Sequence, residues 1–97
     1  MAQKVPENAH LIDFVIANRK ADIKKIGVEL YSNNIISYVQ TTKGGIVLRV
    51  HFKNLVKAIK IASKCIEENN LEVSLLNQKY WEFNAPEFWE RRNGNTI

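Results

Sequence analysis

The sequence of residues 46–69, IVLRVHFKNLVKAIKIASKCIEEN, contains a strand pattern followed directly by a helix pattern. From 46 to 52, apolar residues alternate with other residues, which is typical of a strand with one buried face. The residues that point toward this face are Ile46, Leu48, Val50 and Phe52. From 53 to 69, apolar residues recur at helical spacing, and the apolar face carries Leu55, Ile59, Ala62 and Ile66. We therefore expect both elements to cover one core.

The opposite face of the predicted helix is basic. Its lysines follow an i, i+4, i+7, i+11 pattern and are Lys53, Lys57, Lys60 and Lys64. At about 100° per residue they fall within an arc of roughly 60° and extend over about 16 Å of helix. A row of cations at this pitch suits a nucleic-acid backbone. A solvated outer face has the same composition, so both interpretations stay open.

Upstream of this stretch, turn residues separate two further predicted strands. Residues 27–32 (GVELYS) and 35–41 (IISYVQT) flank the pair Asn33-Asn34, which tolerates the positive φ of a tight hairpin. Residues 43–45 (KGG) then turn the chain into the strand at 46–52. The three strands predict an antiparallel meander.

Helical signals also precede the meander. Pro6 and Glu7 favour a helix start, because proline fits the first turn and a carboxylate suits the positive end of the helix dipole. An apolar run extends this predicted helix to about Arg19. Residues 19–25 are expected to form a basic link to the first strand.

The C-terminal part of the chain predicts short elements. Residues 71–76 (LEVSLL) predict a strand that Asn77-Gln78 turns into another at 80–83, and Asn84 is the expected N-cap of a short helix. Residues 93–97 are expected to be a frayed tail. The fold class that follows is α+β: a small antiparallel sheet, made of a three-stranded meander plus one or two C-terminal strands, with helices packed on one face.

Length and composition limit the class of protein. Ninety-seven residues suffice for a single domain, expected to span 1–97. No apolar run reaches the roughly 18–20 residues of a membrane span, and the N-terminus lacks the apolar stretch of a signal peptide. We therefore expect a cytoplasmic protein with no membrane partner. Cys65 is the only cysteine, so it cannot form an internal disulfide and is expected to be a half-buried structural thiol.

The net charge of +4 is distributed unevenly. Residues 1–64 contain eleven Lys and Arg against four Asp and Glu, a net charge of +7. Residues 65–97 contain three against six, a net charge of −3. This asymmetry favours a basic surface for an anionic partner.

Catalytic patterns are missing from the sequence. The two histidines, His10 and His51, fall in different predicted elements, and no serine lies in a nucleophile-elbow pattern. Residues 43–45 fit a hairpin turn better than a phosphate-binding loop. We expect no enzyme activity, no metal site and no cofactor.

Two groups of residues are candidates for binding. Arg49 and His51 share a strand face that Tyr38 can join, and cations beside an aromatic ring suit single-stranded nucleic acid unless the C-terminal segment covers this face. Five of the nine aromatic residues lie within 80–89. Some of these rings must complete the core, and exposed ones would form a protein-docking patch. The candidate docking residues are Trp81, Phe88, Trp89, Arg91 and Arg92.

The middle of the chain resembles the zinc-binding domain of bacterial DNA primases. The segments that carry the resemblance are 22–32 (DIKKIGVELYS), 37–52 (SYVQTTKGGIVLRVHF) and 54–62 (NLVKAIKIA). In that family a basic strand with a glycine, matched by 24–27, precedes a strand that opens with a serine and an aromatic residue, matched by Ser37-Tyr38. The family's Cys and His zinc ligands are missing except at His51, which implies a zinc-free relative. The resemblance implies binding of the template strand by Lys24, Lys25, Tyr38 and Arg49.

The chain is also similar to small replication accessory proteins of mobile elements, such as staphylococcal chromosomal cassettes. This similarity implies a non-enzymatic protein of DNA replication or priming that binds single-stranded DNA and docks a polymerase or helicase. The alternative is a phage- or plasmid-encoded protein–protein adaptor or inhibitor with no nucleic-acid role. A homodimer that buries its aromatic C-terminus is a third possibility, and the sequence leaves the oligomeric state open.

Overall fold

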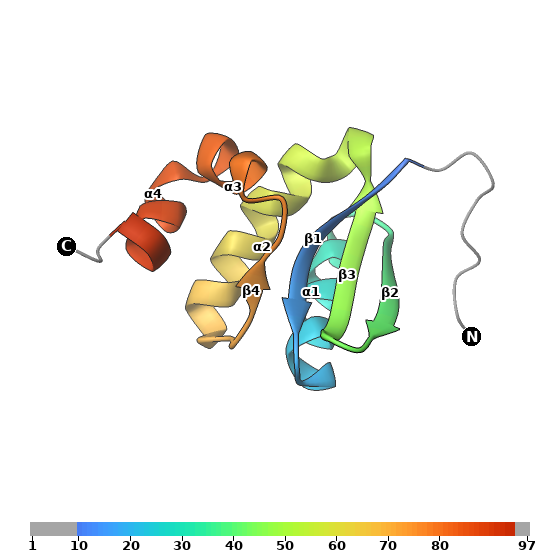
Figure 1. The fold of residues 1–97 in the computed structure, drawn as a ribbon. Coiled ribbons are helices and arrows are strands. Elements are labelled where there is room, and N and C mark those ends of the chain that lie inside the picture. The colour runs from blue at the N-terminus through green and yellow to red at the C-terminus, as the bar shows by residue number, and fades with distance from the viewer. Residues whose placement is uncertain (1–9, 95–97) are drawn as a thin grey trace.

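The fold is a four-stranded antiparallel sheet with helices on one side, described for residues 10–94 by a computed structural model (Figure 1). The strands are β1 (Leu11–Ala17), β2 (Ser37–Thr42), β3 (Gly45–His51) and β4 (Ser74–Leu75). Their order in the sheet is β2-β3-β1-β4, and each pair is antiparallel. The predicted α+β class with a small antiparallel sheet is confirmed.

Two long helices form the second layer, behind the sheet in Figure 1. The helices are α1 (Lys20–Ser32), α2 (Leu55–Asn69), α3 (Gln78–Asn84) and α4 (Pro86–Trp89). A 3₁₀ turn, η1 (Phe52–Asn54), leads into α2, and a π-helical turn, η2 (Glu90–Gly94), follows α4. The short C-terminal helices lie beside α2, far from β2 (Figure 1).

The core lies between the sheet and this helical layer. Leu48 and Val50 of β3 are fully buried, as the alternation in 46–52 predicts. The predicted apolar face of α2 is confirmed, since Leu55, Ile59, Ala62 and Ile66 are all buried. Burial of such a face, and not helix propensity alone, holds an amphipathic helix in place.

The N-terminal element is a strand and not the predicted helix. Residues 11–17 form β1, a central strand between β3 and β4, and residues 6–9 of the predicted helix lie outside the described part of the chain. The helical layer and neighbouring side chains bury much of β1. Its sequence, LIDFVIA, therefore lacks the regular alternation of a strand with one solvent-exposed face. A bulge between Asp13 and Val15 further breaks the alternation.

The segment predicted as a basic link and a strand is the helix α1. Its buried residues Ile23, Ile26 and Leu30 follow helical spacing, and 27–32 continues that helix without a break. Asn34 has the expected positive φ of 65°, but it ends α1 instead of turning a hairpin. The predicted three-stranded meander is therefore wrong: only its last two strands form, as the antiparallel pair β2 and β3, and the other neighbour of β3 is the N-terminal strand β1.

The C-terminal elements are also more helical than predicted. Within 71–76 only Ser74–Leu75 pairs as a strand, and 80–83, predicted as a strand, lies in α3. Ala85, not Asn84, is the N-cap of α4, because the Asn84 side chain donates to the Tyr80 carbonyl at the end of α3. Of the predicted tail, 93 and 94 belong to η2 and 95–97 lie outside the described residues.

Candidate nucleic-acid-binding surface

The lysine stripe, defined as Lys53, Lys57, Lys60 and Lys64, is fully on the surface. Lys53 lies in η1 and the other three lie on the exposed side of α2, opposite its buried face. Ion pairs within residues 10–94 all use arginine: Arg19–Asp22, Arg49–Asp13 and Arg91–Glu67. The positive charge of the stripe is therefore not neutralised by an ion pair within the described residues.

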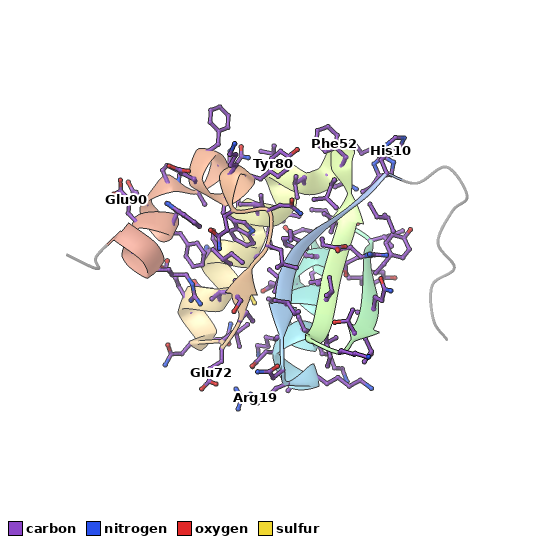
Figure 2. All side chains as sticks on the ribbon, in the orientation of Figure 1. His10, Arg19, Phe52, Glu72, Tyr80 and Glu90 are labelled. Carbon is purple, nitrogen blue, oxygen red and sulfur yellow. The ribbon has the colours of Figure 1, made fainter. Side chains whose placement is uncertain are left out.

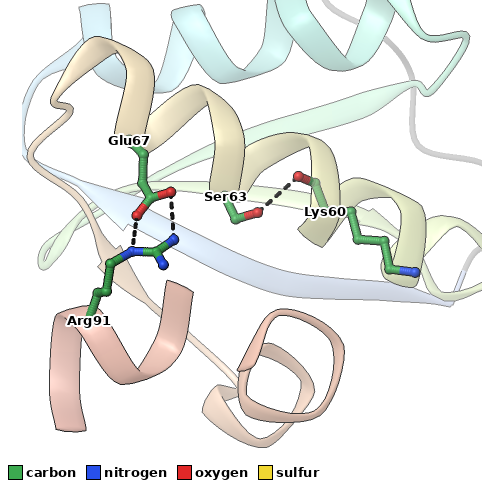
Figure 3. A network of polar contacts seen from close by, with 4 residues as sticks. All are labelled: Lys60, Ser63, Glu67 and Arg91. Carbon is green, nitrogen blue, oxygen red and sulfur yellow. Dashed lines mark hydrogen bonds and ion pairs between the residues drawn. The ribbon is translucent and has the colours of Figure 1, made fainter. Parts of the chain in front are cut away.

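The C-terminal half of the stripe lies between two grooves. Lys60 and Lys64 line a groove against α1 that includes Glu29, and another against α4 that includes Pro86. Figure 3 shows α2 with Lys60, Ser63 and Glu67, and Arg91 reaching toward Glu67 from the C-terminal turn. The Ser63 hydroxyl donates to the Lys60 carbonyl at 2.9 Å.

The Arg91 guanidinium influences the charge beside the stripe. Its Nη2 donates to Glu67 Oε1 at 2.8 Å and its Nε donates to Oε2, a bidentate pair. The ion pair raises the pKa of Arg91, chiefly through the hydrogen bond to Glu67. Arg91 thus compensates the Glu67 carboxylate, which lines the same groove as Lys60 and Lys64.

Exposed aromatic rings gather at the N-terminal end of the stripe. Phe52 is 53% exposed and Tyr80 is 38% exposed, and their ring centroids lie 6.2 Å apart at an angle of 69°. Figure 2 shows both residues at the same end of the molecule. Phe83, one turn after Tyr80, is 85% exposed. We call Phe52, Tyr80 and Phe83 the aromatic end.

A lysine adjoins each ring of the aromatic pair along the chain. Lys53 follows Phe52, and Lys79 precedes Tyr80. The sequence prediction missed this arrangement because it assigned Phe52 to the inner face of the strand at 46–52. The strand instead ends at His51, the chain enters η1, and Phe52 leaves the alternation.

The face of the sheet turned away from the helices, called here the open face, holds the predicted nucleic-acid-binding residues of β2 and β3. Tyr38 of β2 lies opposite Arg49 of β3, which lies opposite Asp13 of β1. Arg49 Nε donates to Asp13 Oδ1 at 2.8 Å, so this cation is already paired. His51 accepts a hydrogen bond from the Lys53 backbone through Nδ1 and caps η1.

The open sheet face and the lysine stripe lie on opposite sides of the molecule. Leu48 and Val50 are buried against the helical layer, so Arg49, which alternates with them, points the other way. The C-terminal helices lie beside α2 and do not cover this face (Figure 1). The structure therefore brings Tyr38 and Arg49 together and separates them from the stripe.

Lys24 and Lys25 belong to the helical layer with the stripe. Both are exposed on α1, where Lys24 borders β2 and Lys25 is close enough to α2 for its charge to act on Cys65. Burial raises the pKa of the Cys65 thiol and the charge of Glu29 adds to this, while Lys25 and the Asn69 side chain oppose it.

The predicted docking residues are part of the packing of the C-terminal helices. Trp81 is 0% exposed, stacks on Phe14 with centroids 5.8 Å apart, and donates from Nε1 to the Phe14 carbonyl at 2.9 Å. Phe88 is buried against Trp81 at 5.6 Å. Both rings are core residues, and a partner cannot reach them in this conformation.

The other three predicted docking residues hold the C-terminal turn in place. Trp89 is half-buried and packs against the core. Arg92 lies over the Phe88 ring at 5.5 Å and donates to the Val73 carbonyl at 2.7 Å. Arg91 binds Glu67, as described above. These contacts attach the C-terminal helices to α2 and to the chain before β4.

Metal and membrane sites were sought among the described residues. Between 10 and 94, no three His, Cys, Asp or Glu side chains lie close enough to share a metal ion. Across the same residues, the helices are too short or too polar to cross a bilayer.

The primase-like segments can be placed on this fold. Residues 24–27, which the resemblance matches to a basic strand, are helical in α1, whereas 37–42 and 45–51 are strands and 55–62 is helical. Comparison of the chain with protein-family models found no match, and comparisons with curated proteins and with solved structures found none either.

Proposed function

We propose that this chain is a non-enzymatic domain that binds single-stranded nucleic acid through the lysine stripe and the aromatic end. The observation that carries the proposal is a row of lysines, unpaired within the described residues, that leads to the exposed Phe52–Tyr80 pair. Cations and aromatic rings in one continuous surface are the two features that single-strand binding needs.

The lysines and the rings act on different parts of the ligand. Each lysine that meets a phosphate releases condensed counterions, which supplies affinity independent of sequence. Bases that stack on exposed rings add roughly 1–3 kcal/mol each. Duplex DNA hides its base faces, so a surface that gains affinity from stacking prefers a single strand.

In this proposal the open sheet face contributes less to nucleic-acid binding than the lysine stripe does. Arg49 is paired with Asp13, and Tyr38 lies next to this pair, so the sheet offers less uncompensated charge than α2. Lys25 shares the helical layer with the stripe and adds to its field. We expect Tyr38, Arg49 and His51 to contribute less to affinity than the stripe.

A role in the cytoplasm, in DNA replication or priming, is the biological setting that we propose. It rests on the resemblance of 37–62 to primase domains, and it makes single-stranded DNA the ligand and a polymerase or helicase the protein partner. Trp81 and Phe88 lie in the core, so these two rings do not form an exposed docking surface for that partner.

The experiment is a titration of a labelled single-stranded oligonucleotide and of its duplex, followed by fluorescence anisotropy. The double variant Lys57→Glu with Lys60→Glu is expected to lose at least about tenfold in affinity for both ligands. Phe52→Ala with Tyr80→Ala is expected to lose about tenfold for the single strand and little for the duplex. All four side chains are exposed, so the fold is expected to persist.

Lys20→Glu with Lys43→Glu is the charge-matched control. It changes net charge equally at sites outside the stripe and is expected to retain most of the affinity. Equal losses in the control and in the stripe variant would mean that only net charge matters. If the unaltered protein fails to bind either ligand at low salt, nucleic-acid binding is rejected and the adaptor class gains support.

A further inference from the structure

Strand β2 is an edge strand of the sheet, with no neighbouring strand on its outer side among residues 10–94. It lies at the end of the order β2-β3-β1-β4, and its pairing with β3 continues without a register shift. Its residues, SYVQTT, include no proline and no charge, which are the usual devices that block an edge. The outer backbone groups of such a strand are a template for another extended segment.

An apolar groove runs beside this edge, between β2 and α1. It is lined by apolar atoms of Ile23, Gly27, Val28 and Val39, and by Tyr31, which is 72% exposed. Val28 and Val39 are also exposed. A segment added to β2 would direct alternate side chains toward this groove, because side chains alternate across a strand.

The charged residues that line the groove are both cationic. They are Lys20 and Lys24, in the first turns of α1. Helix α1 begins at the end of the molecule where β2 ends (Figure 1). The described lining is therefore positive near the end of β2 and apolar farther along.

We propose that β2 and this groove bind an extended segment of another protein by strand addition. The segment has apolar residues at alternate positions and acidic residues at its N-terminal end. In antiparallel pairing it begins where β2 ends, which places its carboxylates beside Lys20 and Lys24. This partner site is separate from the lysine stripe and does not depend on nucleic-acid binding.

A second copy of this chain fits the same edge less well. Residues Ser37–Thr42 carry no acidic side chain, so pairing of β2 with β2 of another copy brings no carboxylate from the strand to Lys20 or Lys24. Charge complementarity therefore favours an acidic peptide over self-association.

The test uses the full chain labelled with ¹⁵N and a synthetic acetylated peptide of three aspartates followed by alternating valine and threonine. Backbone amides of β2, Val28 and Tyr31 are expected to shift most on titration. A peptide with lysines in place of the aspartates is expected to bind about tenfold more weakly. Chemical-shift changes located elsewhere would overturn the proposal. So would the absence of any change at millimolar peptide, once peptides with the valine and threonine positions shifted along the chain have also been tried.

Reversing the charge of the two groove lysines tests whether they select the acidic peptide. Lys20→Glu with Lys24→Glu is expected to invert the preference, with about tenfold weaker binding of the aspartate peptide and tighter binding of the lysine peptide. Lys57→Glu with Lys60→Glu is the matched control and is expected to retain the original preference. If the Lys20 and Lys24 variant still prefers the aspartate peptide, the proposal is contradicted. It is also contradicted if ultracentrifugation detects a dimer of this chain and dimer formation prevents peptide binding.

The two proposals fail separately. If both proposals are right, the Lys57→Glu, Lys60→Glu variant loses oligonucleotide binding and keeps peptide binding. Absence of oligonucleotide binding in the unaltered protein rejects the proposed function without affecting the strand-addition site.

Discussion

At the scale of single residues, Trp81 connects the C-terminal helices to the sheet. Its ring lies between Phe14 of β1 and Phe88 of α4. Its indole N–H donates to the Phe14 carbonyl, which also accepts from the Leu76 amide. This carbonyl lies at the bulge of β1, where the regular ladder is interrupted. A tryptophan that the sequence places in a surface cluster is thus required for the packing of three elements.

Replacement of Trp81 is expected to destabilise the fold, not to remove a surface contact. Trp81→Ala leaves a large cavity and removes one of the two hydrogen bonds that the Phe14 carbonyl accepts, the other coming from the Leu76 amide at 3.1 Å. The expected loss is about 3–5 kcal/mol in the free energy of unfolding. Urea unfolding followed by circular dichroism measures it. Phe83→Ala, at an exposed ring in the same helix, is expected to change the same quantity by less than about 0.5 kcal/mol. Similar values for the two variants would contradict this assignment.

The Cys65 thiol predicts a pH dependence of stability. Burial raises its pKa in the folded state, and the ordinary value is 9.0, so the unfolded chain loses the proton first as pH rises. Between these two pKa values the folded state binds more protons, and the free energy of unfolding falls with rising pH. Well below pH 9.0 the thiol is protonated in both states and contributes no slope.

Cys65→Ala isolates this contribution. Urea unfolding between neutral pH and pH values above 9 is expected to give a steeper decline for the unaltered protein than for the variant. Comparison of the two slopes removes the titration of tyrosines and lysines that both proteins share. Equal slopes would show that the folded thiol ionises as an exposed one does.

At the scale of elements, a glycine fixes the close approach of β3 to β1. Gly45 has a φ of 138°, and a Cβ at this position would lie 2.8 Å from the Ala17 carbonyl oxygen. Gly45→Ala is expected to cost about 2–3 kcal/mol in unfolding free energy, because it combines a strained φ with a backbone clash. Gly44→Ala is the control, since its Cβ would meet only side-chain atoms at 3.8 Å or more. Equal thermal stability of the two variants would contradict this account.

The sequence predicted elements well where one periodicity dominates. Strand β3 and helix α2 have one buried and one exposed face, so alternation in 46–51 and helical spacing in 55–69 located both. Strand β1 lacks such a face contrast, because it lies at the centre of the sheet and contains a bulge. For α1, the β-rich composition of 27–32 outweighed the helical spacing of Ile23, Ile26 and Leu30.

The candidate site was predictable only in part. Helical spacing alone indicated that the four lysines share one exposed face. The aromatic end joins η1 to α3 across more than twenty residues, and its formation depends on where β3 ends and on α3 being helical. Neither point has a local sequence signal, so Phe52 and Tyr80 could not be paired from the sequence.

At the scale of the whole molecule, the layered fold separates three surfaces. The helical layer carries the lysine stripe, the sheet presents Tyr38 beside the Arg49–Asp13 pair, and the β2 edge opens onto an apolar groove. Packing both long helices on one face of the sheet produces this separation (Figure 1). One small domain can in this way contact a nucleic acid and a protein from different sides.

The salt dependence of single-strand binding tests the central claim most directly. Four lysine–phosphate contacts predict that log K falls with log[salt] at a slope of about −3, and Lys57→Gln with Lys60→Gln is expected to reduce the slope to about −1.5. Anisotropy titrations of a labelled oligonucleotide at several salt concentrations give both slopes. An identical slope for the unaltered protein and this variant would contradict the claim that the stripe on α2 binds the phosphate backbone.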